Sequence, residues 1–237
     1  MSRKRKALIG IVSKPVKYAH ETVFRFDELV DNIRYLLVRN GALAIGILPP
    51  MATLDFHEDD FLDSTVLSDE ELADFKLLVD ACDGIILQGG LNSLSYEAAI
   101  AKYAIEKKMP ILGICAGFNN LIRAFGGDVR FNASGSHNKH GKEPVHQVTI
   151  IKESKLFEIL LTERIAVNSM HTMIAEPRDI KGWQPVAYSE DGLVEAIELA
   201  TDQFALGLKW HPEVMVDDDP RMEKIFRAFL AACQSQI

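Results

Sequence analysis

The sequence predicts an α/β fold, in which helices cover a mostly parallel sheet. Short apolar runs alternate along the chain with longer segments whose apolar residues recur at helical spacing, which is typical of βαβ units. Two of the runs lead into glycine-containing turns, Gln88-Gly89-Gly90 and Cys115-Ala116-Gly117. We expect a single domain over residues 1–237, because the length suits one large α/β domain and no linker rich in proline and glycine interrupts it.

The first half of the chain contains four predicted strands, at residues 7–12, 42–48, 84–87 and 110–114. Phe26–Asn40 is predicted to be a helix, and Gly41 suits the residue just beyond its end. A second helix begins at Ser68, a residue type that caps helices, and runs towards Ala81. A third helix is expected near residues 95–108, and the acidic segment 51–68 is expected to be mainly a loop.

The second half changes character after Gly126-Gly127, where short alternating strands replace the longer units. We expect a short helix near residues 154–161, a final helix over 219–233, and strands at 145–151, 165–168, 185–188, 193–199 and 204–209.

Composition limits the class of protein. The net charge of −8 argues against a nucleic-acid-binding surface, which normally shows a basic excess. No segment approaches the roughly 20 apolar residues that span a bilayer, so we expect no membrane association and a cytoplasmic location. Three widely spaced cysteines favour neither a disulfide framework nor a zinc knuckle.

Cys115 is the predicted nucleophile. It stands where an apolar strand meets a helix, with Gly113 and Gly117 two residues to either side. A sharp strand-to-helix turn needs small neighbours, and the N-terminal end of the following helix favours a thiolate. The alternative is a small buried hydrophobic cysteine, which is the interpretation we give to Cys82 and Cys233.

His211 and Glu213 are the predicted base and its orienting carboxylate. A thiol nucleophile needs an imidazole to accept its proton, and the imidazole needs a carboxylate to fix its tautomer. Two residues apart on an extended segment, the two side chains would point the same way. The alternative is that the two residues lie on an exposed loop and have no catalytic role. The presence of Cys115 in the predicted turn favours the catalytic interpretation.

Attack on an amide produces a negatively charged oxygen that backbone N–H groups stabilise. The N–H of Ala116 is the natural first donor. Gly89 or Gly90 is the expected second donor, because both follow the neighbouring strand and glycine lets the backbone approach a substrate closely. An ordinary turn would also use two glycines.

Together these segments resemble the class I glutamine amidotransferases, and within them the γ-glutamyl hydrolases of the C26 peptidase type. Three further segments carry this resemblance: 167–171 (VNSMH), 191–198 (DGLVEAIE) and 207–213 (GLKWHPE). The resemblance implies a flavodoxin-like three-layer sandwich, a thioester on Cys115 and no cofactor. Many members have Arg and Gln where this chain has Ala116 and Asn119. We take Asn119, Asn168, Ser169 and His171 as candidate substrate contacts.

Four histidines, His137, His140, His146 and His171, form a candidate metal cluster. His137 and His140 lie in a loop with no helix to orient them, and carboxylates are sparse nearby, so no metal is expected. The loop over residues 132–143 is expected instead to line or cover the active site.

The sequence therefore favours a hydrolase acting on a small γ-glutamyl substrate. A glutaminase subunit that delivers ammonia to a separate synthase chain is the alternative, and a non-catalytic binding protein is a third hypothesis. The amine that leaves, a homodimer and a synthase partner all stay open at this stage.

Overall fold

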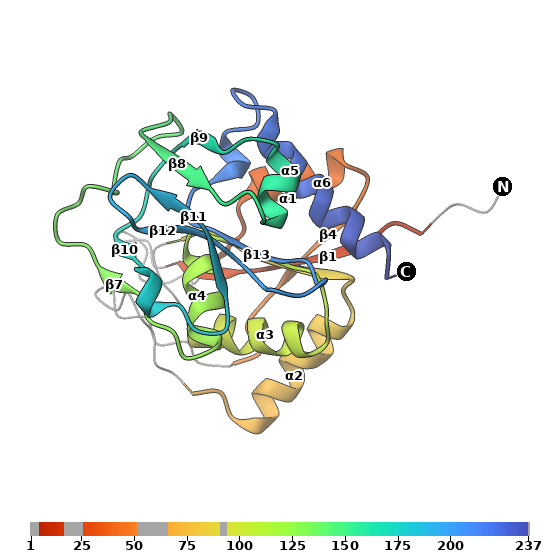
Figure 1. Ribbon diagram of the computed structural model, residues 1–237. Helices are drawn as coiled ribbons and strands as arrows, with labels where there is room; N and C mark the ends of the chain where they lie inside the picture. The colour runs from red at the N-terminus through yellow and green to blue at the C-terminus, as the bar shows by residue number, and fades with distance from the viewer. Residues whose placement is uncertain (1–4, 17–25, 52–65, 91–93, 237) are drawn as a thin grey trace.

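The computed structural model describes residues 5–16, 26–51, 66–90 and 94–236. A nine-stranded sheet in the order β4-β1-β5-β6-β13-β12-β11-β8-β9 forms its centre (Figure 1). The first five strands in this order are parallel, and the last four continue the sheet with antiparallel pairing. The bounds of the strands are β1 Leu8–Val12, β4 Leu43–Ile47, β5 Gly84–Leu87, β6 Ile111–Ile114, β8 His146–Ile150, β9 Arg164–Val167, β11 Gln184–Ser189, β12 Val194–Glu198 and β13 Ala205–Leu208.

Helices cover both faces of the sheet (Figure 1). One face carries α1 (Asp31–Arg39), α5 (Lys155–Leu160) and α6 (Arg221–Gln234), and the other carries α2 (Asp69–Asp80), α3 (Ser95–Glu106) and α4 (Ala116–Ala124). Alternate residues of β6 serve the two faces: Leu112 and Ile114 belong to one core and Ile111 to the other. The predicted three-layer α/β sandwich is therefore confirmed.

One parallel pairing brings distant parts of the chain together. In the register of β6 and β13, Ile114 lies opposite Leu208. The pairing continues one residue further, because the N–H of Cys115 donates to the carbonyl oxygen of Leu208 over 2.8 Å. The residues that follow these two strands therefore meet at the same edge of the sheet.

The helix predicted over Phe26–Asn40 starts later than the sequence pattern indicates. Phe26–Glu28 forms strand β3, which pairs antiparallel with β2 (Lys14–Val16), and α1 begins only at Asp31. The side chain of Gln88 stabilises this turn, since it accepts from the Val30 N–H over 2.7 Å and donates to the Glu28 carbonyl over 2.8 Å. Contacts from elsewhere in the fold thus override the helical spacing of the first residues.

Other short elements also depend on contacts between distant segments. Strands β7 (Arg130–Phe131) and β10 (Met173–Ile174) pair with each other and were not predicted.

The capping role of Ser68 is confirmed, because Ser68 and Glu71 form a reciprocal capping box. Most of the loop predicted over 51–68 lies outside the described residues.

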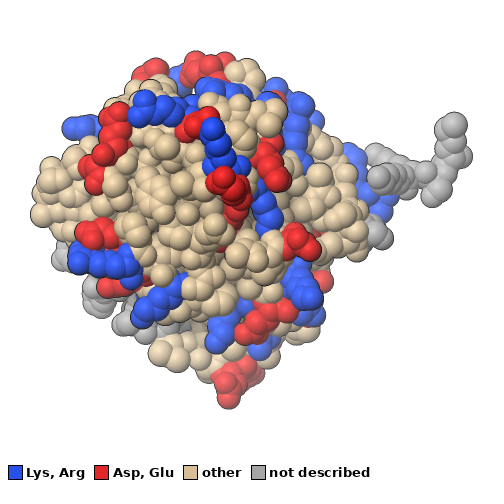
Figure 2. All heavy atoms as spheres, viewed as in Figure 1, with Lys and Arg blue, Asp and Glu red and all other residues tan. Residues whose placement is uncertain are grey.

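The surface carries both signs of charge. Figure 2 shows Lys and Arg side chains interspersed with Asp and Glu over the visible face. Among the described residues, no helix combines the length and the apolar character needed to cross a bilayer.

Helix α4 packs so closely on the sheet that Gly117 cannot carry a side chain. A Cβ atom there would overlap the backbone carbonyl of Leu87 in β5. Replacement by Ala must move backbone rather than a flexible side chain, so we expect Gly117→Ala to lower the free energy of unfolding by about 3 kcal/mol. Urea denaturation measures this loss.

Gly41→Ala provides the matched control for this substitution. Gly41 has φ +87°, and a Cβ atom at this position would have no neighbouring atom within 4 Å, so its replacement strains only the backbone. We expect a cost of about 1 kcal/mol there. Equal losses in the two variants would contradict the packing explanation.

Candidate active site

Cys115 occupies a strained turn between β6 and α4. Its φ is +52° and its ψ −99°, a region that residues with side chains rarely adopt. The flanking glycines make the turn possible: a Cβ on Gly113 would lie 2.8 Å from the Gly117 carbonyl group. The turn directs a nearly buried Cys115, 5% exposed, to the edge of the sheet where β13 also ends.

His211 and Glu213 follow β13 and form the pair that the sequence predicts. His211 Nδ1 lies 2.7 Å from Glu213 Oε1, and the Glu213 side chain is buried. The backbone differs from the expectation, because Pro212–Val214 forms a 3₁₀ turn, η2, rather than extended chain. The proline suits the first position of such a turn, and the turn, not strand alternation, brings the carboxylate to the imidazole.

Asn168 holds the backbone of His211 in place. Its side chain accepts from the His211 N–H over 2.9 Å and donates to the His211 carbonyl over 3.0 Å. Asn168 is fully buried and lies just beyond β9, at the far edge of the sheet. Both ends of the amide are thus used on the histidine, which makes Asn168 a positioning residue; its predicted contact with substrate stays a prediction.

The charges favour a thiolate–imidazolium pair. Burial by itself would raise the pKa of the Cys115 thiol, but the charge and hydrogen bond of His211, helped by Lys209, hold that pKa below its ordinary value. Burial also opposes the charged form of His211, yet Glu213 and Cys115 raise the pKa of His211 well above its ordinary value. Both shifts favour an ionised nucleophile beside a proton donor.

Lys209 is a buried residue of the segment 207–213 for which no role was predicted. It is fully buried, its Nζ donates to Asn119 Oδ1 over 2.5 Å, and it lies 5.2 Å from the centre of the Phe118 ring. Burial lowers the pKa of Lys209 to about 8, against the charges of Cys115 and Glu195. The hydrogen bond fixes the amide of Asn119 with its oxygen towards Lys209.

Cys115 and His211 line a cavity of about 310 Å³. Of the predicted site residues, Gly90, Cys115, Ala116, Asn119, His171 and His211 line it. Asn138 and His140 also line it, which confirms the expectation for the loop over 132–143. Sequence patterns did not predict the remaining lining residues, Glu28, Met170, Thr172 and Met173. They come from strand β3 and the segment 170–173. Met170 lies in the segment 167–171 that carries the family resemblance, but none of the four was predicted to line the site.

The two glycines after β5 have different surroundings. Gly89 packs against the imidazole of His211, and a Cβ atom there would overlap ring atom Cε1. Gly90 has φ +151° and borders both the cavity and the side chain of Lys14. Gly90 and Ala116 thus line the cavity together with Cys115, while Gly89 makes room for the histidine. The oxyanion hole itself stays a prediction.

Ser169 and His171 belong to a hydrogen-bonded group beside the cavity. The Ser169 hydroxyl donates to the His137 carbonyl over 2.7 Å and lies 3.2 Å from His171 Nε2. Ser169 is fully buried and does not line the described part of the cavity. His171 belongs to the hydrogen-bonded group and also lines the cavity.

The charge arrangement predicts selective alkylation. At about pH 6, where an ordinary thiol is almost fully protonated, Cys115 should react with iodoacetamide faster than the other two cysteines, because His211 and Lys209 lower the pKa of its thiol. Burial raises the pKa of Cys82 to about 11 and also raises the pKa of Cys233, so both should stay unmodified. Peptide mass spectrometry after timed alkylation measures the three rates.

The variant His211→Gln tests whether His211 lowers the pKa of the Cys115 thiol. Loss of the imidazolium should raise the pKa of Cys115 and slow its alkylation at about pH 6 by roughly tenfold or more. An unchanged rate would show that His211 does not set the state of the thiol.

Comparisons with known proteins agree with this fold. The glutaminase domain of a Trypanosoma brucei CTPS with bound acivicin has a TM-score of 0.67 at 19% identity, over 97% of this chain and 94% of that one. A glutamine amidotransferase from Thermotoga maritima has a TM-score of 0.55 at 16% identity, over 98% and 92%. These likenesses concern the fold alone.

Sequence comparison gives closer similarities. The γ-glutamyl-γ-aminobutyrate hydrolase of Escherichia coli is 33% identical over 156 residues, 59% of each chain. The protein NtpR of Enterococcus hirae is 29% identical over 155 residues, 61% of this chain and 64% of that one. The matched part spans between 55% and 59% of the length of the first three relatives. The Peptidase C26 profile matches residues 91–213, which is more than half of the chain and includes Cys115, His211 and Glu213, and the chain therefore belongs to the Peptidase C26 family.

Proposed function

We propose that this protein is a cysteine-dependent hydrolase that cleaves the γ-glutamyl amide bond of a small substrate. The observation that carries the proposal is the arrangement of Cys115 and His211 at the wall of a cavity, with Glu213 on the far nitrogen of the imidazole. The lowered pKa of the Cys115 thiol and the raised pKa of His211 fit this arrangement. A thiolate beside an imidazolium supplies both groups that amide cleavage needs, a nucleophile and an acid for the leaving amine.

In the first step the Cys115 thiolate attacks the γ-carbonyl carbon. The carbonyl oxygen takes the negative charge, and the N–H groups of Ala116 and Gly90 are the donors we assign to it. The tetrahedral intermediate collapses as His211 gives its proton to the leaving nitrogen. The C–N bond breaks, a γ-glutamyl thioester remains on Cys115, and the amine departs.

In the second step water replaces the amine. Neutral His211 takes a proton from the water as its oxygen attacks the thioester carbonyl, and the C–S bond breaks to return the thiolate. Glutamate leaves, and His211 is again an imidazolium. Glu213 keeps the ring in one orientation through both steps.

The cavity suits a small substrate. Its volume of about 310 Å³ is near the lower end of ligand pockets. A γ-glutamyl group has an ammonium and a carboxylate at its α carbon. We assign the carboxylate of Glu28 to the ammonium, and the amide of Asn119 and imidazole of His140 to the carboxylate. The similarity to a γ-glutamyl-γ-aminobutyrate hydrolase supports this substrate class.

A panel of γ-glutamyl amides, including glutamine and γ-glutamyl-γ-aminobutyrate, tests the proposal. We expect turnover of at least one member, loss of turnover in Cys115→Ala, and a fall of about 10²–10⁴-fold in kcat for Glu213→Gln, which removes the charge but keeps the shape. Cys82→Ala, outside the cavity lining, is the control and should retain activity.

The panel also separates the alternatives. Turnover of glutamine only, and only when a synthase chain is added, would favour the glutaminase subunit. Turnover that survives in Cys115→Ala would contradict the proposed nucleophile.

Asn168→Ala tests the support of the histidine. Loss of both hydrogen bonds to the His211 backbone should let the imidazole shift, so kcat should fall by about 10–100-fold while KM changes little. Steady-state kinetics on the best amide of the panel, with a thermal unfolding control, measures the two constants. A raised KM at constant kcat would instead support a direct substrate contact.

A further inference from the structure

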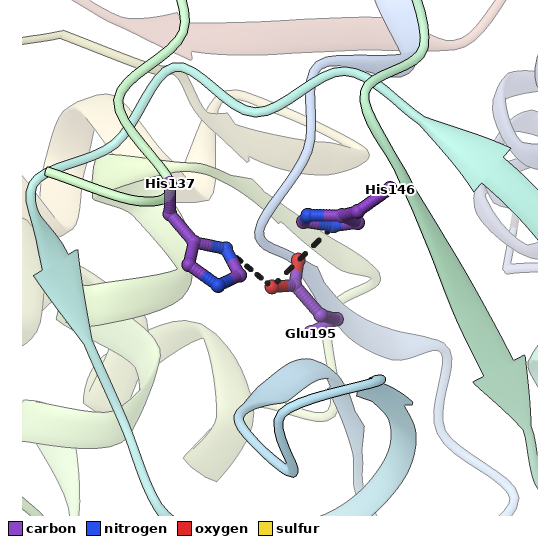
Figure 3. A group of neighbouring side chains, drawn as sticks. All are labelled: His137, His146 and Glu195. Atoms are coloured by element: carbon purple, nitrogen blue, oxygen red, sulfur yellow. Dashed lines mark ion pairs between the residues drawn. The ribbon is translucent and has the colours of Figure 1, made fainter.

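A second group of side chains with metal-ligand chemistry lies beside the active-site cavity. Figure 3 shows His137 and His146 turned towards the carboxylate of Glu195. His137 Nδ1 lies 3.5 Å from Glu195 Oε1, and His146 Nε2 lies 3.8 Å from the same oxygen. The three residues come from the loop before β8, from β8 and from β12, so only the folded chain brings them together.

The carboxylate of Glu195 has no hydrogen-bond partner within the described part of the chain. Its side chain is 1% exposed, and both oxygens are buried and unpaired there. His146 Nε2 is also buried without a hydrogen bond to any described residue. The charge of the buried Lys209 acts on Glu195 but supplies no hydrogen bond to it. A buried carboxylate without hydrogen bonds is costly, so this one favours a directly bound cation or a proton.

Hydrogen bonds on the far side of two imidazoles favour tautomers with a lone pair towards Glu195. His137 Nε2 lies 2.9 Å from Asp191 Oδ2, so in the neutral ring Nε2 carries the proton and Nδ1 a lone pair. His171 Nδ1 lies 3.0 Å from the Met173 carbonyl, which can only accept, so Nε2 of that neutral ring also carries a lone pair. His171 Nε2 is 3.8 Å from Glu195 Oε1. The Ser169 hydroxyl also lies there, 3.4 Å from His137 Nδ1 and 3.2 Å from His171 Nε2, so a bound ion would replace these two contacts.

The spacing suits a tetrahedral metal ion. Bonds of about 2.0–2.1 Å to nitrogen and oxygen put neighbouring ligands roughly 3.3 Å apart. The histidine nitrogens lie 3.5 and 3.8 Å from Glu195 Oε1, so the side chains would draw together around an ion. The ligand atoms of His137, His146 and Glu195 all lie within 4.8 Å of one another. Asp191 adds the carboxylate that orients a metal-binding histidine from behind.

We propose that His137, His146 and Glu195 bind a divalent transition-metal ion such as Zn²⁺, with His171 placed as the fourth ligand. The ion would tie the loop of His137 to β8 and β12. Asn138 and His140 of that loop line the active-site cavity, so the ion would fix one cavity wall. This revises the sequence-based expectation of no metal, because Glu195 supplies the carboxylate that the loop lacks.

The test measures metal binding directly and does not depend on catalysis. All proteins carry Cys115→Ala, so that the active-site thiolate cannot hold the ion. After chelator treatment, calorimetric titration with ZnCl₂ should show one tight site per chain. Co²⁺ in its place should give the visible absorption of a tetrahedral site.

Glu195→Gln keeps the shape of the side chain and should weaken Zn²⁺ binding by about 100-fold or more. Asp191→Asn changes a half-exposed side chain and should weaken it by about 10–100-fold, which keeps the test decisive where Glu195→Gln fails to fold. His140→Gln, in the same loop but outside the cluster, is the matched control and should bind as the parent does.

The absence of tight binding of Zn²⁺ and Co²⁺ to the folded Cys115→Ala protein would overturn the proposal and leave a proton on the cluster as the explanation. Equal affinities of Asp191→Asn, Glu195→Gln and His140→Gln would overturn it too, because the ion would then sit elsewhere.

Discussion

The parallel pairing of β6 with β13 is the constraint on which the site depends. Its register sets Ile114 opposite Leu208, and the hydrogen bond from Cys115 to Leu208 extends it into the turn. The nucleophile and the histidine both follow from this alignment, although they are far apart in the chain. Because side chains alternate along a strand and both faces of β13 are buried, a slip of one residue would move each of its side chains into the opposite core. The buried pattern on both faces makes such a slip costly.

Burial and charge are balanced at this edge of the sheet. Cys115, Lys209 and Glu213 are all buried there, where an isolated charge is unfavourable. Each charge is held by another: the thiolate by His211 and Lys209, and the imidazolium by Glu213. The same exclusion of water that costs stability strengthens these interactions. The strained backbone at Cys115 likewise costs stability, and it holds the thiol at the edge of the sheet.

Sequence patterns predicted the layers of the fold and the residues of the candidate triad, because those signals are local. Apolar periodicity marks strands and helices, and the glycines around Cys115 mark a tight turn. The hydrogen bonds of Asn168 to His211, the Lys209–Asn119 contact and strand β3 were not predicted. Each depends on which strands become neighbours and in what register, which local spacing does not contain. Even the His211–Glu213 contact, though predicted, is made by a turn that strand periodicity does not suggest.

Strand β12 shows how selective the burial of carboxylates is. All five of its residues are buried, including Glu195 and Glu198. The oxygens of Glu198 accept from the backbone N–H groups of Lys155 and Leu156, at the start of α5, where a negative charge is favourable. Glu195 lies three residues earlier and is surrounded by imidazole nitrogens instead. The fold thus satisfies one buried glutamate with backbone donors and sets the other among imidazoles and near the charge of Lys209, without a hydrogen bond from any described residue.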